Sequence, residues 1–295
     1  SSSLRVQYME FVKAVTSDGL ILQGLLAAPS KNTDTVILHI PGMAGNFWEN
    51  GFIKTMLHEY PSQNIAFLSV ELRGSEVTRM FPTTDGYRTI GNAYELFEDC
   101  VKDIDAWMAF LTSQGYNKIH LQGHSLGCSK IAYYQTHATN NAHSLILISP
   151  SDMLGLELEP KNLAEHKKLL AEATALKNVG KKLQLLTKPT WEVYPLSAQT
   201  YLNFFQNTSN TAIFNYFQPS LGFKTVAAIT VPILSILGTK DDGIVTPAKD
   251  ATALLKKHAS KAPTFKGIVL DGAKHSFEGF EKRITKEVAT FIKGI

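Results

Sequence analysis

Short, continuously apolar runs alternate with longer segments of helical periodicity through the first half of the chain. Residues 35–40, 64–71 and 144–149 are such runs, and they are typical of strands buried on both faces of a sheet. The segments between them carry apolar residues at three- and four-residue steps, most clearly over 92–111. This alternation predicts right-handed βαβ crossovers and therefore a parallel sheet with helices on both faces.

The alternation is interrupted once. It stops after Pro150 and resumes at Val231, with predicted strands at 231–237 and 265–270 and predicted helices at 247–258 and 281–292. With a hairpin-like pair at 6–15 and 20–28 and a strand beginning at Lys118, the count predicts a mostly parallel eight-stranded α/β sheet. We expect a core formed by residues 1–150 and 227–295 and a mostly helical insertion over 151–226.

The other expected elements are less regular. Helices are predicted at 49–60, 126–138 and 162–186, whereas 75–91, which contains proline, glycine and several threonines, is predicted to be a surface loop. The segment 189–223 is crowded with aromatic residues and broken by proline and glycine.

Composition excludes several classes of protein. The net charge of +3 over 295 residues is too small to predict nucleic-acid binding. Two cysteines make neither a disulfide framework nor a metal site, and no apolar stretch is long enough to cross a membrane. We expect a soluble cytoplasmic protein, with removal of a leader peptide as an open alternative; the oligomeric state is not predicted.

The sequence Gly123-His124-Ser125-Leu126-Gly127 joins a predicted strand to a predicted helix. This is the context in which a G-x-S-x-G motif forms a nucleophile elbow, a strained turn that exposes the serine hydroxyl at the sheet edge. Ser125 is therefore the predicted nucleophile.

A serine nucleophile needs a base and an acid that orients the base, in the chain order Ser, acid, His. His275 leaves the last predicted strand and is the predicted base. The acid leaves the strand before it, where Asp241 and Asp242 are adjacent. Counting along the strand from Pro232 favours Asp241, whereas counting back from Ile244 and Val245 favours Asp242. We take Asp242 as the acid, with Asp241 as the alternative.

Two main-chain amides are predicted to stabilise the oxyanion: that of Leu126, directly after the nucleophile, and that of Met43, in the glycine-bearing turn after strand 35–40. This turn lacks the pattern of a phosphate or dinucleotide site, and no His or Asp cluster has metal-ligand spacing. We expect no cofactor and no metal. Part of the aromatic segment is expected to bind the substrate, and the alternative is that it forms the core of the insertion; the candidates are Trp191, Tyr194, Phe204 and Phe205.

The elbow, the acid loop 238–245 and the histidine loop 273–277, in this order, resemble the α/β-hydrolase superfamily over nearly the whole chain. Within it, Pro41-Gly-Met-Ala-Gly-Asn46 resembles the oxyanion loop of feruloyl and cinnamoyl esterases. The segment 93–100 and the elbow are also similar to siderophore-esterase-like hydrolases of the DUF1749 group. The resemblance implies a Ser-His-Asp triad and a cap domain at 151–226.

These observations predict a serine hydrolase that cleaves a small-molecule carboxylic ester through an acyl-enzyme, with an apolar or aromatic acyl group under the cap. The alternatives are a thioesterase or acyltransferase of a biosynthetic pathway, or a ligand-binding protein on the same scaffold.

Overall fold

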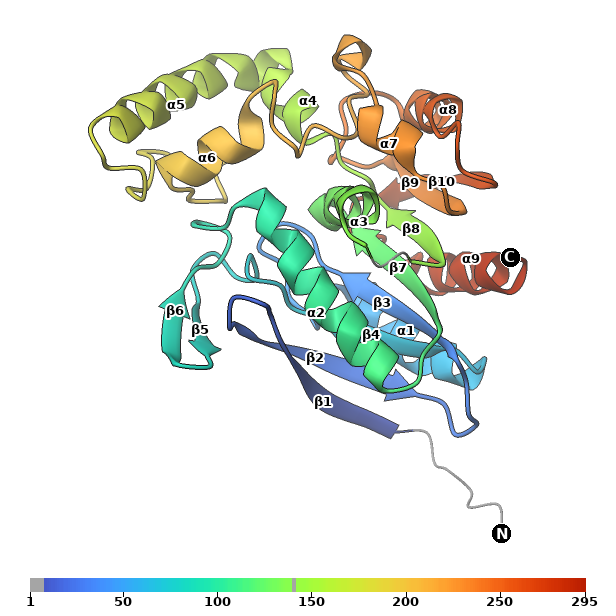
Figure 1. The fold of residues 1–295 in the computed structure, drawn as a ribbon. Helices are drawn as coiled ribbons and strands as arrows, with labels where there is room; N and C mark the ends of the chain where they lie inside the picture. The colour runs from blue at the N-terminus through green and yellow to red at the C-terminus, as the bar shows by residue number, and fades with distance from the viewer. Residues whose placement is uncertain (1–7, 140–141) are drawn as a thin grey trace.

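A twisted eight-stranded sheet runs through the molecule in the computed structural model, which describes residues 8–139 and 142–295 (Figure 1). The strand order is β1-β2-β4-β3-β7-β8-β9-β10, with β1 and β2 antiparallel and the other strands parallel to one another. The strands are β1 Tyr8–Val15, β2 Ile21–Ala28, β3 Thr35–Ile40, β4 Ala66–Val70, β7 Lys118–His124, β8 Ser144–Ile148, β9 Ile233–Lys240 and β10 Phe265–Lys274. The predicted fold class is confirmed; residues 6 and 7 of the first predicted strand lie outside the described residues.

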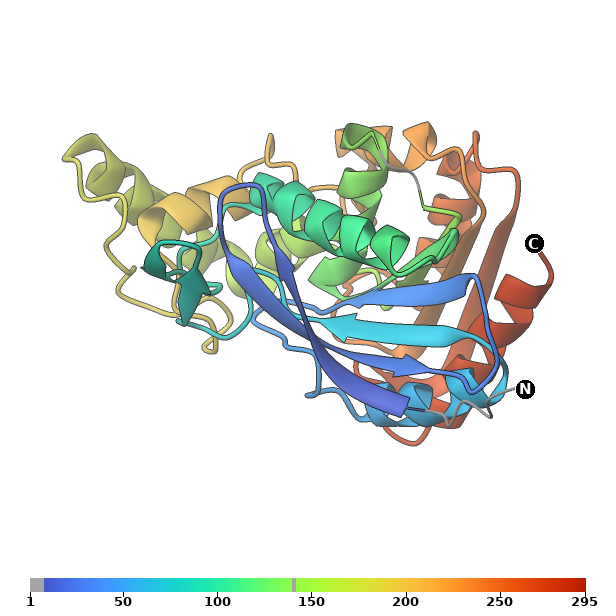
Figure 2. The ribbon, with the colours of Figure 1, turned by 60° about the horizontal axis from the view of Figure 1, so that its bottom comes forward.

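Helices cover both faces of the sheet (Figures 1 and 2). On one face lie α1 (Gly51–Ser62) and α9 (Glu281–Lys293), and on the other lie α2 (Cys100–Ser113), α3 (Leu126–His137) and α8 (Ala248–His258). Side chains of one strand alternate between the two faces, so Ile37 of β3 packs toward α1 whereas Val36 and Leu38 pack toward α3. This two-sided burial explains why the central strands are apolar throughout.

Most of the chain between β8 and β9 forms the insertion segment, from the start of α4 to the end of α7 (residues 153–228). Its elements are α4 (Met153–Leu158), α5 (Pro160–Asn178), α6 (Ala198–Phe205), the short 3₁₀ helix η2 (Pro219–Leu221) and α7 (Lys224–Ala228). Figure 1 shows α5 and α6 beside one end of the sheet, whereas α7 packs against α3 and α8. The predicted helix 162–186 is too long, because α5 ends at Asn178 and Gly180 follows with a φ of 77°.

Two predicted boundaries between β4 and α2 are wrong. The expected loop 75–91 contains a small hairpin, β5 (Met80–Thr83) and β6 (Gly86–Thr89). The helix expected from 92 begins only at Cys100, after a 3₁₀ turn, Phe97–Asp99.

Contacts with the insertion segment explain this late start. The carbonyl of Ala93 accepts a hydrogen bond from the amide of Ser197 at 2.9 Å, and the amide of Phe97 donates to Asn203 Oδ1 at 2.8 Å. Main-chain groups that would have bonded within a helix are therefore bonded to the insertion segment.

None of the helices in the described part of the chain combines the length and the apolar character needed to cross a bilayer.

Candidate active site

Ser125 occupies a sharp turn between β7 and α3. Its φ of 56° and ψ of −125° are strongly disfavoured for a residue with a Cβ. A Cβ on Gly123 would lie 2.5 Å from the carbonyl of Gly127, and a Cβ on Gly127 would lie 2.3 Å from the carbonyl oxygen of Ile40. No side chain fits at either position, so the two glycines of the motif are what allow this turn to form.

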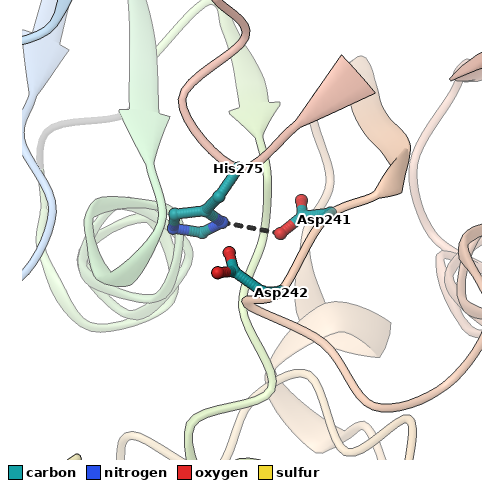
Figure 3. A group of neighbouring side chains, drawn as sticks. All are labelled: Asp241, Asp242 and His275. Carbon is teal, nitrogen blue, oxygen red and sulfur yellow. Dashed lines mark hydrogen bonds and ion pairs between the residues drawn. The ribbon is translucent and has the colours of Figure 1, made fainter. Parts of the chain in front are cut away.

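His275 and Asp241 meet at the same sheet edge (Figure 3). Each directly follows a parallel strand, His275 after β10 and Asp241 after β9. The distance from His275 Nδ1 to Asp241 Oδ1 is 2.6 Å, and the Asp241 side chain is fully buried. Because Nδ1 is bonded to the carboxylate, Nε2 is the nitrogen left to exchange a proton with a substrate or a nucleophile.

Asp242 is the predicted acid, but the hydrogen bond to His275 is made by the alternative, Asp241. The amide of Gly243 donates to Asp241 Oδ1 at 2.8 Å and closes a tight turn. In this turn Asp241 points inward and Asp242 is exposed. Counting back from Ile244 pointed to the carboxylate that does not bond His275, because β9 continues to Lys240, three residues beyond its predicted end.

The two partners shift each other's pKa in opposite directions. Burial lowers the pKa of His275, but the hydrogen bond and the charge of Asp241, with smaller contributions from Asp242 and Glu278, outweigh burial and raise it above 6.5. Burial raises the pKa of Asp241, but its hydrogen bond to His275 and the charge of that residue outweigh burial and lower it. Asp241 is therefore ionised at neutral pH and stabilises a proton on the imidazole.

Ser125 and His275 line one hollow of about 830 Å³. In the described part of the chain no hydrogen bond joins the two side chains; instead, Ser125 Oγ lies 3.2 Å from Ser151 Oγ. Ser151 is buried and also lines the hollow. The sequence analysis missed Ser151, although its position just after β8 put a polar side chain at the same sheet edge.

His124 holds the histidine loop in place. Its Nε2–H donates to the main-chain carbonyl of His275 at 2.9 Å, and the hydroxyl of Ser149 donates to the same oxygen at 3.1 Å. Burial, with the nearby charge of His275, lowers the pKa of His124 to about 3, so its ring is neutral. Sequence reasoning did not assign His124 this role, because residues 124 and 275 are brought together only by the order of the strands.

The predicted oxyanion loop approaches the nucleophile closely. A Cβ on Gly42 would lie 3.0 Å from Cβ of Ser125, and Met43 lines the hollow. Leu126 is the first residue of α3, where a main-chain N–H has no acceptor within the helix. Leu126 thus directly follows Ser125, and Met43 belongs to the loop that packs against it.

The four predicted substrate-binding aromatics separate into two pairs. Trp191 and Tyr194 line the hollow, on a tight turn closed by two hydrogen bonds between Thr190 and Tyr194. Phe204 and Phe205 do not line it, because both are fully buried and pack against other rings, Phe204 also against Phe97 outside the insertion segment. The position of these two residues agrees with the alternative, in which the aromatic residues form the core of the insertion.

Other reactive groups near the site are poorly suited to catalysis. Cys128 is buried, which raises the pKa of its thiol, and its Sγ lies 3.1 Å from the carbonyl of Gly123. Burial lowers the pKa of His39 to about 3.

Among the described residues, one group of three side chains has donor atoms close enough for a metal ion, within 4.8 Å of one another: Asp241, Asp242 and His275. Here His275 Nδ1 uses its proton to bond Asp241, so this nitrogen is not free to bind a cation.

A second hollow of about 900 Å³ lies at the opposite ends of the strands and is lined in part by His120, which contacts a serine. His120 Nδ1 lies 2.7 Å from Ser144 Oγ. Ser144 is fully buried within β8, and burial lowers the pKa of His120 to about 4. A buried hydroxyl beside so weak a base is not a competing nucleophile.

A family model described as "Protein of unknown function (DUF1749)" matches residues 81–293, more than half of the chain. The chain belongs to the DUF1749 family. This confirms the similarity inferred from the elbow and the segment 93–100. No curated protein sequence matches this DUF1749 member.

Solved structures with the same architecture cover almost the whole DUF1749 chain. They include Est1E of Butyrivibrio proteoclasticus with bound ferulic acid, at 17% identity and a TM-score of 0.66, covering 96% of this chain and 98% of that chain. A carboxyl esterase of Bacillus coagulans has 14% identity and a TM-score of 0.66, covering 97% and 98%. The siderophore hydrolase EstB of Aspergillus fumigatus has 12% identity and a TM-score of 0.70, again covering 97% and 98%. At these identities the likeness establishes the α/β-hydrolase fold, as predicted.

Proposed function

We propose that this DUF1749 protein is a serine hydrolase that cleaves carboxylic esters through an acyl-enzyme. The observation that carries the proposal is the 2.6 Å contact between His275 Nδ1 and buried Asp241, beside a serine on a strained elbow that lines the same hollow. A buried acid, an imidazole with a raised pKa and a hydroxyl at the wall of a hollow are the parts that nucleophilic acyl transfer requires.

In the proposed reaction Ser125 Oγ turns from Ser151 toward His275 Nε2 and attacks the ester carbonyl. The Ser125 proton passes to Nε2, and Asp241 stabilises the resulting imidazolium. The tetrahedral intermediate then collapses, the leaving alcohol takes the proton from Nε2, and the acyl group stays on Ser125. Water, deprotonated by the same imidazole, releases the acid and restores the hydroxyl.

The developing oxyanion is stabilised by the main-chain amides of Met43 and Leu126. Their positions beside Ser125 support this role, since preorganised amides at such a site typically contribute about 100- to 1000-fold in rate. In resting hydrolases these contacts are often incomplete and tighten only when the substrate binds.

Residues 151–226 act, in this proposal, as a cap over the acyl group. Support comes from Trp191 and Tyr194, which bring two aromatic rings from the insertion segment to the hollow. The esterase names of the structural neighbours favour an ester over a thioester as the first class to test.

The test is the hydrolysis of a panel of para-nitrophenyl esters and matched thioesters by the wild type and by Ser125→Ala. We expect turnover of esters by the wild type and a loss on the order of 10⁴-fold or more in Ser125→Ala, with unchanged thermal unfolding. Ester turnover that survives in the variant contradicts the proposal, and ligand binding without any turnover indicates a binding protein instead.

A further inference from the structure

The hollow around Ser125 carries much more negative than positive charge. Among the described residues that line it, Lys161 is the one with an ammonium group, and it forms an ion pair with Glu159 at 2.8 Å. Within residues 8–139 and 142–295, no lysine or arginine forms an ion pair with the other acidic residues of the lining. Those residues are Glu49, Glu192, Asp242 and Glu278. The chain as a whole has a net charge of +3, so this excess is local to the hollow.

These four carboxylates come from four separate parts of the fold. Glu49 precedes α1, Glu192 belongs to the tight turn of the insertion segment, Asp242 follows β9, and Glu278 follows β10. They therefore reach the hollow from four separate elements instead of forming one exposed face of a single helix. Negative charge distributed around a concave surface focuses its field into the cavity more strongly than the same charge on a flat surface.

The field reaches groups inside the hollow. Burial is the larger cause of the raised pKa of Tyr194, and the charge of Glu49 raises it further. The charges of Asp242 and Glu278 add to that of Asp241 in raising the pKa of His275. A positive group on a bound substrate would experience the same field with the opposite sign.

The aromatic side chains of the lining also favour a positively charged ligand. Trp191 and Tyr194 lie edge to face with ring centroids 6.1 Å apart, and the chain positions between them include Glu192. The face of an aromatic ring attracts cations through its quadrupole, and carboxylates beside aromatic rings suit ammonium groups in particular. An anion is repelled by both features.

We propose that this enzyme selects esters carrying an ammonium group and discriminates against anionic esters and thioesters. The inference deepens the proposed function and rests on it, because the carboxylates act on a substrate held at Ser125 and form no site of their own. The same charges repel the carboxylate product and speed its release. Anionic carrier thioesters are disfavoured for the same reason.

The experiment compares three para-nitrophenyl esters with the same chain length. One acid carries a terminal trimethylammonium group, the second has a tert-butyl group in its place, and the third ends in a carboxylate. Each kcat/KM is divided by the rate constant for hydroxide hydrolysis of the same ester, which removes inductive effects. At low ionic strength we expect the cationic ester to exceed the neutral isostere by about 10-fold and the anionic ester to fall below it by a similar factor. In about 0.5 M NaCl both ratios should shrink to about 2-fold.

Charge-neutralising variants assign the effect to the hollow. Glu192→Gln combined with Glu278→Gln should reduce the ratio of cationic to neutral ester to about 3-fold at low ionic strength. The matched control removes the same amount of charge from exposed residues that do not line the hollow, Glu10→Gln with Asp250→Asn, and should leave the ratio unchanged.

The outcomes separate the two proposals. If the neutral ester is not hydrolysed and Ser125→Ala changes nothing, the proposed function fails. If the neutral ester is hydrolysed but the three esters react equally at low salt, or the control variants change the ratio as much as the variants in the hollow, the charge selectivity is overturned and the hydrolase remains.

Discussion

The sheet and the insertion segment position the side chains of the candidate site in different ways. Ser125, Asp241 and His275 are each the first residue after a parallel strand, following β7, β9 and β10. In the insertion segment, Trp191 and Tyr194 reach the hollow whereas Phe204 and Phe205, of similar size and hydrophobicity, are buried in its interior.

The difference shows which positions follow from chain order and which depend on packing. The carboxyl ends of parallel strands meet at one edge, so the order of strands determines which loops adjoin. In the insertion no such order exists, and each aromatic ring is placed by the particular turn or helix that carries it. Trp191 reaches the hollow because it lies on a tight turn in which it and Glu192 both have positive φ.

The largest expected effect separates two adjacent carboxylates of the same loop. Asp241→Asn should lower kcat/KM for a neutral ester by about 10³- to 10⁴-fold, because His275 loses the charge that orients and stabilises its protonated form. Asp242→Asn, which removes an exposed carboxylate, should lower it by less than about 3-fold. Steady-state kinetics of the two variants, with circular dichroism as the control for folding, make the comparison. A larger loss in Asp242→Asn than in Asp241→Asn would return the acid to the position that the sequence analysis preferred.

A second pair of variants tests the division among the aromatics. Phe204→Ala should lower the free energy of unfolding by about 3–5 kcal/mol, because it opens a cavity inside the insertion segment. Trp191→Ala, at the hollow, should raise KM for aromatic esters several-fold, roughly the loss of 1 kcal/mol of contact. Denaturant unfolding and initial rates on both variants are the measurements. Equal effects of the two substitutions on KM would show that the insertion segment binds substrate through its whole aromatic cluster.

The smallest expected effect is a shift in pH dependence. A base acts only when neutral, and the pKa of His275 is raised. Activity should therefore fall as the pH decreases through a value above 6.5. Removing the charge of Glu278 with Glu278→Gln removes one cause of the raised pKa and should move this acid limb to lower pH. An acid limb that moves to higher pH in Glu278→Gln would contradict the electrostatic coupling between these groups. An acid limb that stays unchanged in both Glu278→Gln and Asp241→Asn would also contradict it.

Much of the fold and part of the candidate site could be predicted from residue patterns. Ser125 and His275 were identifiable because the elbow and the last strand are marked by glycines and continuous apolar runs. The carboxylate that bonds His275 could not be chosen from the sequence. The predicted end of β9 lay three residues too early, and nothing local distinguishes Asp241 from Asp242. The roles of Ser151 and His124 depend on contacts between strands distant in sequence, 26 residues apart for Ser151 with Ser125 and 151 for His124 with His275. The late start of α2 depends on hydrogen bonds from the insertion segment, which no propensity scale includes.

In the proposed mechanism, His275 and Asp241 activate the hydroxyl of Ser125. Reaction of the intact protein with a fluorophosphonate, followed by peptide mass spectrometry, identifies the activated group. We predict a single adduct on Ser125, formed rapidly in the wild type, much more slowly in Asp241→Asn and not at all in Ser125→Ala. An adduct on another residue, or labelling that is unchanged in Ser125→Ala, would contradict this mechanism.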